Sequence, residues 1–405
     1  MIGVRLRPIT SPPAVPAEKR IPRVIPGIAA FHENSEPEKG VSRDMRDMAV
    51  SGTAKERGGA VGWGQGWDQA VVLWLWVIAG LVLAMITVGG ATRLTDSGLS
   101  ITEWQPILGT IPPLTEAQWQ EALEKYRQIP QYQLINKGMS LEDFKFIFWW
   151  EWGHRFLGRI IGLAFALPLL AFWFVGALKP GYGVKFLGVL ALGGLQGVIG
   201  WYMVKSGLVD RVDVSQYRLA LHLTVAFVIL AWVVWLALDL AKPSTSTVLP
   251  RIAAPSRLPG LIVAVLFAQV VLGAFVAGLK GGLVYNTWPS MNGAFVPYDL
   301  WAIEPWYLNP FENPVMAQFN HRLVAYAIAA LAALELWRTL RNVERSGAET
   351  RSAVLLMAGV MAQVALGIWT LLAAVPIGLG IVHQAAAAVL LVIAVRHLHV
   401  VRRSA

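Results

Sequence analysis

Four of the seven histidines in this chain lie near the beginning of long apolar stretches, where an ionisable side chain is costly and therefore indicates function. They are His154, His222, His321 and His383. The residue four positions after each one is small, which would leave space one helical turn away for a flat macrocycle. These small residues are Gly158, Ala226, Ala325 and Ala387. Two imidazoles from facing helices are what axial ligation of a haem iron requires, so the pattern predicts two haem sites.

The residue three positions before the histidine differs between two otherwise similar segments. Glu151 precedes His154, whereas Gln318 precedes His321. Because residues three apart share a helix face, we expect the Glu151 carboxylate near the first site. We interpret that site as one of acid–base or cation-stabilising chemistry, and the second as the site of a tightly held cofactor. The alternative is that Glu151 only pairs with a nearby arginine.

Four arginines lie at the same ends of the apolar stretches as the histidines. They are Arg93, Arg155, Arg218 and Arg322. Their guanidinium groups could pair with haem propionates, or extend to lipid phosphates instead. A zinc site is the next alternative for the histidines, but neither predicted pair has a third ligand at suitable spacing. We interpret His32, His397 and His399 as solvated residues without such a role.

The elements that must position these residues are membrane-spanning helices. The chain is 56% hydrophobic and 15% charged, whereas a soluble domain carries about 25% charged residues. Eight apolar segments are each long enough to cross a hydrocarbon core of about 30 Å. They lie near residues 70–92, 147–178, 184–204, 217–240, 260–280, 318–338, 353–375 and 379–396. The sequence therefore predicts an all-α integral membrane protein with eight transmembrane helices.

The two halves of the chain repeat. Gly89, Gly98, Leu99, Trp104, Gly109 and Pro113 recur 184 positions later, His154, Arg155, Gln196 and Gly200 recur 167 positions later, and His222 recurs 161 positions later as His383. This ordered set predicts two four-helix bundles related by a pseudo-twofold axis along the membrane normal. We expect a disordered tail at 1–66, an N-terminal half at 67–242 and a C-terminal half at 258–399. A capping box at 115–118 predicts a short amphipathic helix within the long connection 93–146.

Charge fixes the expected orientation. Lysine and arginine gather after the fourth, sixth and eighth segments, so both termini are expected in the cytoplasm and the histidines near the outer face. The net charge of +9 therefore reflects membrane edges, and we expect no nucleic-acid partner. The absence of cysteine excludes disulfides, thiolate metal sites and iron–sulfur clusters.

Over residues 70–396 the sequence resembles the haem A synthase family. The resemblance rests on the eight segments, the two repeats, the Glu-x-x-His-Arg motif from Glu151 to Arg155, and the three later histidines. It implies that His154 and His222, with Arg93, Arg155 and Arg218, bind the substrate haem o. It also implies a haem b cofactor ligated by His321 and His383 beside Arg322. The lack of cysteine is similar to the cysteine-free proteobacterial branch.

The resemblance also implies a reaction and a setting. The family oxidises a methyl substituent of haem o to a formyl group by two hydroxylations and loss of water, and Glu151 matches its essential carboxylate. The product, haem A, serves cytochrome oxidase. We expect a bacterial inner-membrane protein in contact with lipid, haem o and an unidentified redox partner. Haem O synthase, the oxidase or its assembly factors, and a second copy of the chain are further candidate partners.

Two other classes of protein share part of this pattern. A dihaem b-type electron-transfer cytochrome needs haems at two depths, whereas all four histidines are expected at one. A haem chaperone would bind the cofactor as well, but it has no need of a carboxylate such as Glu151 beside the iron. A solute transporter fits less, because no apolar segment is broken at mid-membrane in both halves.

Overall fold

The computed structural model describes residues 62–105, 108–208, 211–241, 256–342 and 345–403. All of them belong to one compact unit, Gly58–Ala405. The predicted tail 1–66 lies mostly outside these ranges, and the first helix begins at Gly62. Within the described ranges the regular structure is helical, apart from one isolated bridge between Met291 and Ala294.

Eight helices are long and apolar enough to cross a membrane, which confirms the predicted segments. They are α1 (Gly62–Leu94), α4 (Leu141–Phe174), α5 (Tyr182–Lys205), α6 (Gln216–Leu240), α7 (Leu258–Gly278), α9 (Pro314–Arg341), α10 (Gly347–Leu372) and α11 (Ile377–Arg403). Helix α4 begins before the predicted 147, because the side chain of Ser140 caps it by accepting from the Asp143 amide. Glu151 and His154 therefore lie several turns inside the helix, not in its first turns as predicted.

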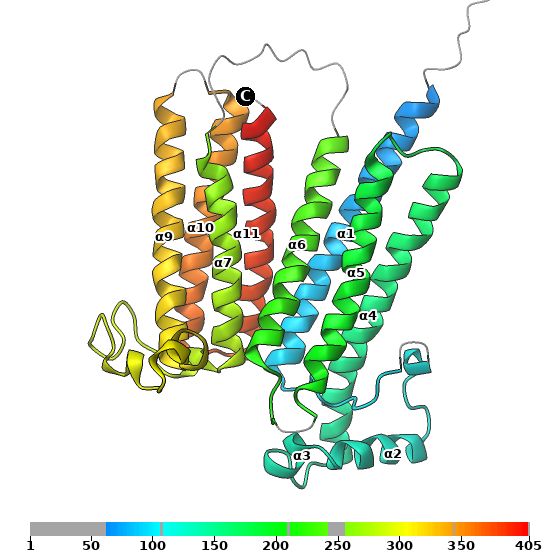
Figure 1. The fold of residues 1–405 in the computed structure, drawn as a ribbon, viewed down its shortest axis with the longest axis vertical. Helices are drawn as coiled ribbons and strands as arrows, with labels where there is room; N and C mark the ends of the chain where they lie inside the picture. Colours follow the sequence, from blue (N-terminus) through cyan, green and yellow to red (C-terminus); the bar gives the residue numbers. More distant parts are fainter. Residues whose placement is uncertain (1–61, 106–107, 209–210, 242–255, 343–344, 404–405) are drawn as a thin grey trace, which may run out of the picture. The chain divides into compact units, whose positions relative to one another are not determined.

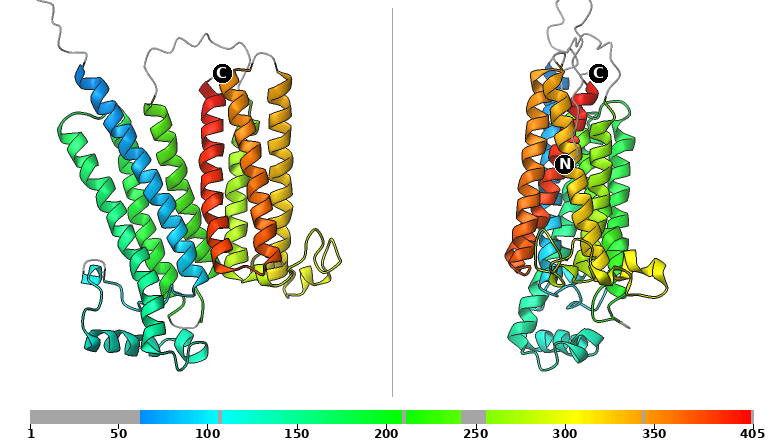
Figure 2. Two further views of the ribbon diagram at one scale, coloured as in Figure 1. Left: turned by 180° about the vertical axis from the view of Figure 1, so that it is seen from behind. Right: turned by 90° about the vertical axis from the view of Figure 1, so that its left-hand side faces the viewer.

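The helices pack in the same order in each half of the chain (Figures 1 and 2). In the N-terminal half α1 contacts α4, α4 contacts α5, α5 contacts α6, and α6 contacts α1. In the C-terminal half α7, α9, α10 and α11 form the same closed ring of contacts. The halves meet through α6 with α7, α1 with α11, and α6 with α11. A twofold axis relating the two rings remains a prediction.

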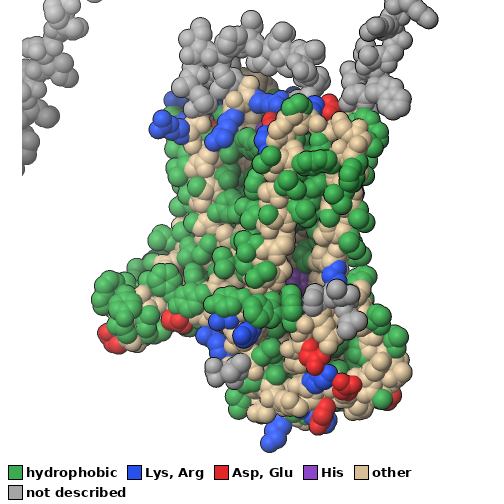
Figure 3. All heavy atoms as spheres, turned by 45° about the vertical axis from the view of Figure 1, so that its right-hand side comes forward, with side chains coloured by type: hydrophobic (Ala, Val, Ile, Leu, Met, Phe, Trp, Pro, Cys, Tyr) green, Lys and Arg blue, Asp and Glu red, His purple; other side chains and the backbone are tan. Residues whose placement is uncertain are grey.

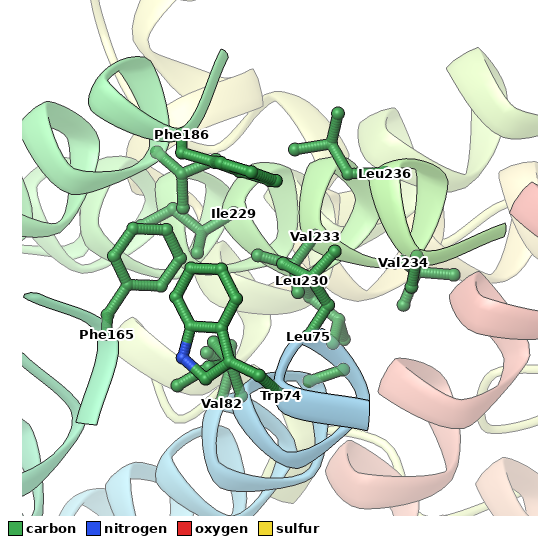
Figure 4. Packing of buried hydrophobic residues seen from close by; sticks show 14 of the residues in the cluster. Trp74, Leu75, Val82, Phe165, Phe186, Ile229, Leu230, Val233, Val234 and Leu236 are labelled. Atoms are coloured by element: carbon green, nitrogen blue, oxygen red, sulfur yellow. The ribbon is translucent and has the colours of Figure 1, made fainter. Parts of the chain in front are cut away.

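The largest cluster of buried apolar side chains joins α1, α4, α5, α6 and α11 (Figure 4). At its centre, the ring of Trp74 lies 4.8 Å from that of Phe165 and 5.5 Å from that of Phe186. Its indole N–H donates to the Ala164 carbonyl at 2.9 Å. In lipid such interlocking contacts, more than transfer from water, hold helices together. On the face seen in Figure 3, hydrophobic side chains occur along the length of the helices, and charged side chains gather towards the two ends.

The predicted amphipathic helix is present as α2 (Glu116–Arg127), followed by the short α3 (Pro130–Leu134). Its capping box is formed: Thr115 accepts from the Gln118 amide, and the Gln118 side chain accepts from the Thr115 amide. Its apolar face buries Trp119 against Phe148 of α4, with ring centroids 4.9 Å apart. The helix thereby packs onto the part of α4 that precedes Glu151.

The corresponding connection in the C-terminal half has only short helical turns. They are η2 (Gly281–Leu283), η3 (Tyr298–Trp301), η4 (Trp306–Leu308) and α8 (Asn309–Glu312). The buried side chain of Asn313 organises them: it caps α9 by accepting from the Val315 amide, and it donates to the carbonyls of Asp299 and Leu300. This connection is thus fixed to the beginning of α9.

The interpretation of His397 and His399 as solvated is wrong. Helix α11 continues to Arg403, and both side chains are buried within it. The ring of His397 lies 3.4 Å from a Glu335 carboxylate oxygen, and that of His399 lies 3.5 Å from Asp239. The apolar pattern had marked only the membrane-crossing part of the helix and missed this polar packing at its end.

Candidate functional site

Each of the four histidines packs its ring against a glycine of a neighbouring helix. In the N-terminal half, a β-carbon added to Gly89 would lie 3.2 Å from the His154 ring, and one added to Gly200 would lie 3.2 Å from the His222 ring. In the C-terminal half, the distance would be 3.1 Å from Gly273 to the His321 ring and 2.9 Å from Gly367 to the His383 ring. At such distances a larger residue would require the histidine ring to shift, most of all at Gly367. The glycines come from α1, α5, α7 and α10, so in each case one helix supplies a histidine and a helix beside it supplies the surface against which that histidine rests.

In the N-terminal half the structure brings the two histidines together. The ring centroids of His154 and His222 are 6.5 Å apart, and the planes are nearly perpendicular at 89°. Metal–imidazole bonds of about 2.0–2.1 Å would place the centres of two rings on opposite sides of one metal about 6 Å apart. No group of three or more histidine and acidic side chains that could hold a metal ion occurs within the described residues.

Glutamines support three of the four histidines from the neighbouring helix. The Nε2 of Gln196 donates to the His222 carbonyl at 2.8 Å. Gln269 and Gln363 likewise donate at 3.0 Å to the carbonyls of His321 and His383. Both glutamines of the C-terminal half also reach a ring nitrogen, at 3.2 Å from Nε2 of His321 and 3.3 Å from Nδ1 of His383.

Two of the four histidines have a buried ring nitrogen that is free to bind a metal. The Nδ1 atoms of His222 and His321 are buried and lack a hydrogen-bond partner among the described residues. A buried polar atom without a partner requires an explanation, and a bound ion is one of the recognised ones. With the glycine surfaces beside them, they fit a haem held by imidazoles. No ring contact between His321 and His383 occurs in the described part, so their pairing on one iron remains a prediction.

Glu151 is 2% exposed and binds a loop of its own half. One carboxylate oxygen accepts from the Ser100 hydroxyl and from the Ile101 amide, both at 2.7 Å, and the other pairs with Arg155. Arg155 also donates to the carbonyls of Ile101 and Glu103, at 2.7 and 3.0 Å. Glu151 and Arg155 therefore hold residues 100–103 against α4. Glu151 precedes His154 in this helix by three residues.

The C-terminal half builds the same clamp without the carboxylate. Gln318 donates to the Tyr285 carbonyl at 3.1 Å, and Arg322 donates to it at 3.0 Å. Tyr285 stands 184 positions after Ile101, so the two clamps bind equivalent loops. The Tyr285 hydroxyl donates to Asp299, and this hydrogen bond raises the pKa of the phenol. What distinguishes the halves here is a buried negative charge in the first.

Known proteins match the chain over most of its length. Residues 72–395 match the model of the COX15-CtaA family, described as cytochrome oxidase assembly protein. The chain belongs to this family. It is 49% identical over 331 residues to the "Heme A synthase" of Parvibaculum lavamentivorans, covering 82% of this chain and 94% of that protein. It is similarly 50% identical to that of Brucella ovis over 329 residues, 81% of this chain and 91% of that protein.

The predicted propionate-binding arginines all have protein partners in this family member. Arg93 pairs with Asp96 at 2.8 Å and Asp213 at 3.2 Å, near the junction of the halves. Arg218 donates to the Tyr202 carbonyl at 2.6 Å and lies over its ring. Arg155 and Arg322 hold the loops described above. Each guanidinium has five N–H groups, so these contacts leave donors for a further ligand, and the propionate role remains a prediction.

Sequence reasoning missed how the histidines are supported. The sequence repeat includes Gln196 with Gly200 and Gln363 with Gly367, but it predicts no role for them. Gln269 is not part of the repeat, because the residue 184 positions before it is Met85. A search for Gln-x-x-x-Gly, which places both side chains on one helix face, would have found all three glutamines.

Proposed function

We propose that this chain is a haem A synthase, which oxidises one methyl substituent of haem o to a formyl group. The observation that carries the proposal is the His154–His222 pair, with perpendicular rings 6.5 Å apart and a buried carboxylate three residues before one of them. The relatives named "Heme A synthase" support it at about half identity over most of both chains. Two hydroxylations give a hydrated aldehyde, which loses water to leave the formyl group.

The residues divide between two haem sites. His154 and His222 would ligate the substrate haem o and then the product haem A, and His321 and His383 would ligate a haem b cofactor. When bound, haem b would supply electron transfer between the substrate site and a redox partner. The haem propionates would pair with arginines that lie near the histidines in sequence. These are Arg155 and Arg218 at the substrate site and Arg322 at the cofactor site. Arg93, which is already paired with two carboxylates, would act from the junction of the halves.

Glu151 would act as a fixed negative charge. Its carboxylate already accepts from Ser100, Ile101 and Arg155, so it is held in place and has no freedom to swing toward a substrate. A preorganised carboxylate of this kind stabilises positive charge that develops at the reacting carbon. It would also keep residues 100–103 in position to orient the methyl-bearing edge of the macrocycle.

The setting follows from the charge distribution. We infer that the protein lies in a bacterial inner membrane with both termini in the cytoplasm, because basic residues gather at the connections on that side. The histidines would then lie near the outer face. Haem O synthase would supply the substrate, and the oxidase or its assembly factors would take the product.

Exchanging the two equivalent side chains tests the proposal. In Glu151→Gln, haem o or a hydroxylated intermediate should accumulate while haem b is retained, because the variant removes only the charge. The matched control is Gln318→Glu, which adds a carboxylate at the equivalent position and should leave the first site able to convert its substrate. Extraction and chromatography of the haems measure both variants. Full conversion to haem A in Glu151→Gln would refute the assigned role, and two haem b groups per wild-type chain would favour an electron-transfer cytochrome.

A further inference from the structure

One of the four histidine supports lacks its glutamine. In three helices a glutamine stands four residues before the glycine on which the histidine rests, and it binds the histidine carbonyl of the next helix. In α1 the residue four positions before Gly89 is Met85. Its thioether has no N–H to donate. Its terminal methyl instead packs towards Gly158, 3.4 Å from where a β-carbon there would lie.

The support is graded across the four sites. In the C-terminal half a glutamine contacts both the ring and the carbonyl of each histidine. In the N-terminal half Gln196 reaches only the carbonyl of His222. No other helix of the described structure provides a hydrogen bond to either group of His154. His154 is therefore the one histidine of the four with no glutamine contact at its ring or at its carbonyl.

The orientation of the ring agrees with this grading. The ring atom nearest to the glycine is Cε1 in His222, His321 and His383, but it is Nε2 in His154. A different edge of the His154 ring therefore faces its glycine. Among the described residues, neither ring of the N-terminal half receives a hydrogen bond from a glutamine, and only His154 lacks one at its carbonyl as well.

We propose that Met85 keeps His154 an exchangeable ligand, through which haem o enters and haem A leaves the N-terminal site. The inference rests on the proposed function, because it concerns the site assigned to the substrate. Outer groups that hold a metal-ligating histidine in place strengthen its bond to the metal, and their loss costs about 10–100-fold in metal affinity. Here the glutamine amide holds the main-chain carbonyl of the histidine. A cofactor that stays benefits from such partners at both ligands. A product that must leave after every reaction is released more easily when one ligand lacks them.

The test adds or removes one glutamine in each half. Full-length wild-type protein, Met85→Gln, Met85→Leu and Gln269→Met are purified, and each is mixed with excess apomyoglobin to capture any haem that dissociates. Chromatography identifies the captured haem: haem o or haem A reports the N-terminal site and haem b the C-terminal site. We expect Met85→Gln to slow release of haem o and haem A by about 10-fold or more, and Gln269→Met to speed release of haem b by a similar factor.

Met85→Leu is the matched control, because it preserves apolar volume without adding an amide. It should release haem o at the wild-type rate. If Met85→Gln released haem o and haem A as fast as the wild type, the inference would be overturned. It would also be overturned if Gln269→Met retained haem b as firmly as the wild type. This second comparison still decides the matter if Met85→Gln fails to fold. Haem A formation by the wild type is measured separately. Its absence would count against the proposed function, whereas unchanged release rates in a protein that makes haem A would count only against the role of Met85.

Discussion

In the C-terminal half, Gln269 and Gln363 each contact a histidine at its ring and its carbonyl, whereas in the N-terminal half only the His222 carbonyl has such a contact. The four glycine surfaces, by contrast, are present in both halves. Under the proposed assignment, the shared glycines would shape the space for a macrocycle, and the differing glutamine contacts would determine how firmly each histidine is held. This division is what a cofactor site and a substrate site built on one plan require.

A second difference lies at the far ends of the helices. In the C-terminal half, Glu335 of α9 is fully buried and pairs with Arg345 at 3.1 Å. Arg345 also lies 3.3 Å from Glu349, and the His397 ring from α11 approaches Glu335 at 3.4 Å. The residue 167 positions before Glu335 is Pro168, within α4. A buried ionic cluster therefore joins the helix ends of the C-terminal half, which is assigned to the cofactor. At the equivalent position of the N-terminal half, α4 has a proline, which cannot donate a backbone hydrogen bond.

The largest expected effect comes from filling a glycine surface. In Gly367→Val the new β-carbon would begin 2.9 Å from Cε1 of His383, so the ring must move and haem b should be lost. Gly89→Val should instead abolish binding of haem o while haem b remains, because only His154 is displaced. Haem content per chain, resolved by chromatography, measures both. Gly193→Val in α5 is the control, since no atom lies within 4 Å of where a β-carbon there would lie. Retention of both haems in Gly367→Val would contradict the assignment of His383 to haem b.

Sequence patterns predicted the parts of this molecule that depend on composition and local order. The eight apolar helices and the capped helix α2 followed from hydropathy and from residues 115–118, and both are confirmed. The pairing of Glu151 with Arg155 was anticipated only as the alternative reading of that carboxylate. Its binding to Ile101 was not predicted, because a main-chain donor leaves no signature in the sequence.

The polar cluster around His397 shows a different limit. An apolar pattern ends where charged residues begin, and the last apolar segment ends at Arg396. Only the fold reveals that α11 continues, and that Arg345, from the connection between α9 and α10, reaches back to Glu335. Contacts between side chains of distant segments depend on packing that no local pattern encodes.

An intermediate effect is expected from breaking the ionic cluster. Arg345→Met leaves Glu335 and Glu349 buried without their shared cation, and removing one partner of a buried pair costs about 3–5 kcal/mol. Thermal unfolding in detergent should show the loss, with haem b released at a lower temperature than in the wild type. Arg341→Met, at an exposed position of α9, is the matched control and should unfold like the wild type. An unchanged unfolding temperature for Arg345→Met would mean that the cluster does not stabilise this half.

The smallest effect should come from Ser100→Ala, which removes one of the donors to Glu151. The Ile101 amide and Arg155 still hold the carboxylate, so we expect the clamp to lose about 1.5–3 kcal/mol of stability, the usual range for a hydrogen bond to a charged group. Conversion of haem o should slow while haem b content stays constant, because Ser100 belongs to the N-terminal clamp alone. The equivalent residue 184 positions later is Val284, which has no hydroxyl, so Val284→Ala serves as the control. If both variants slowed conversion equally, loss of side-chain volume in the loops, and not the hydrogen bond to Glu151, would explain the result.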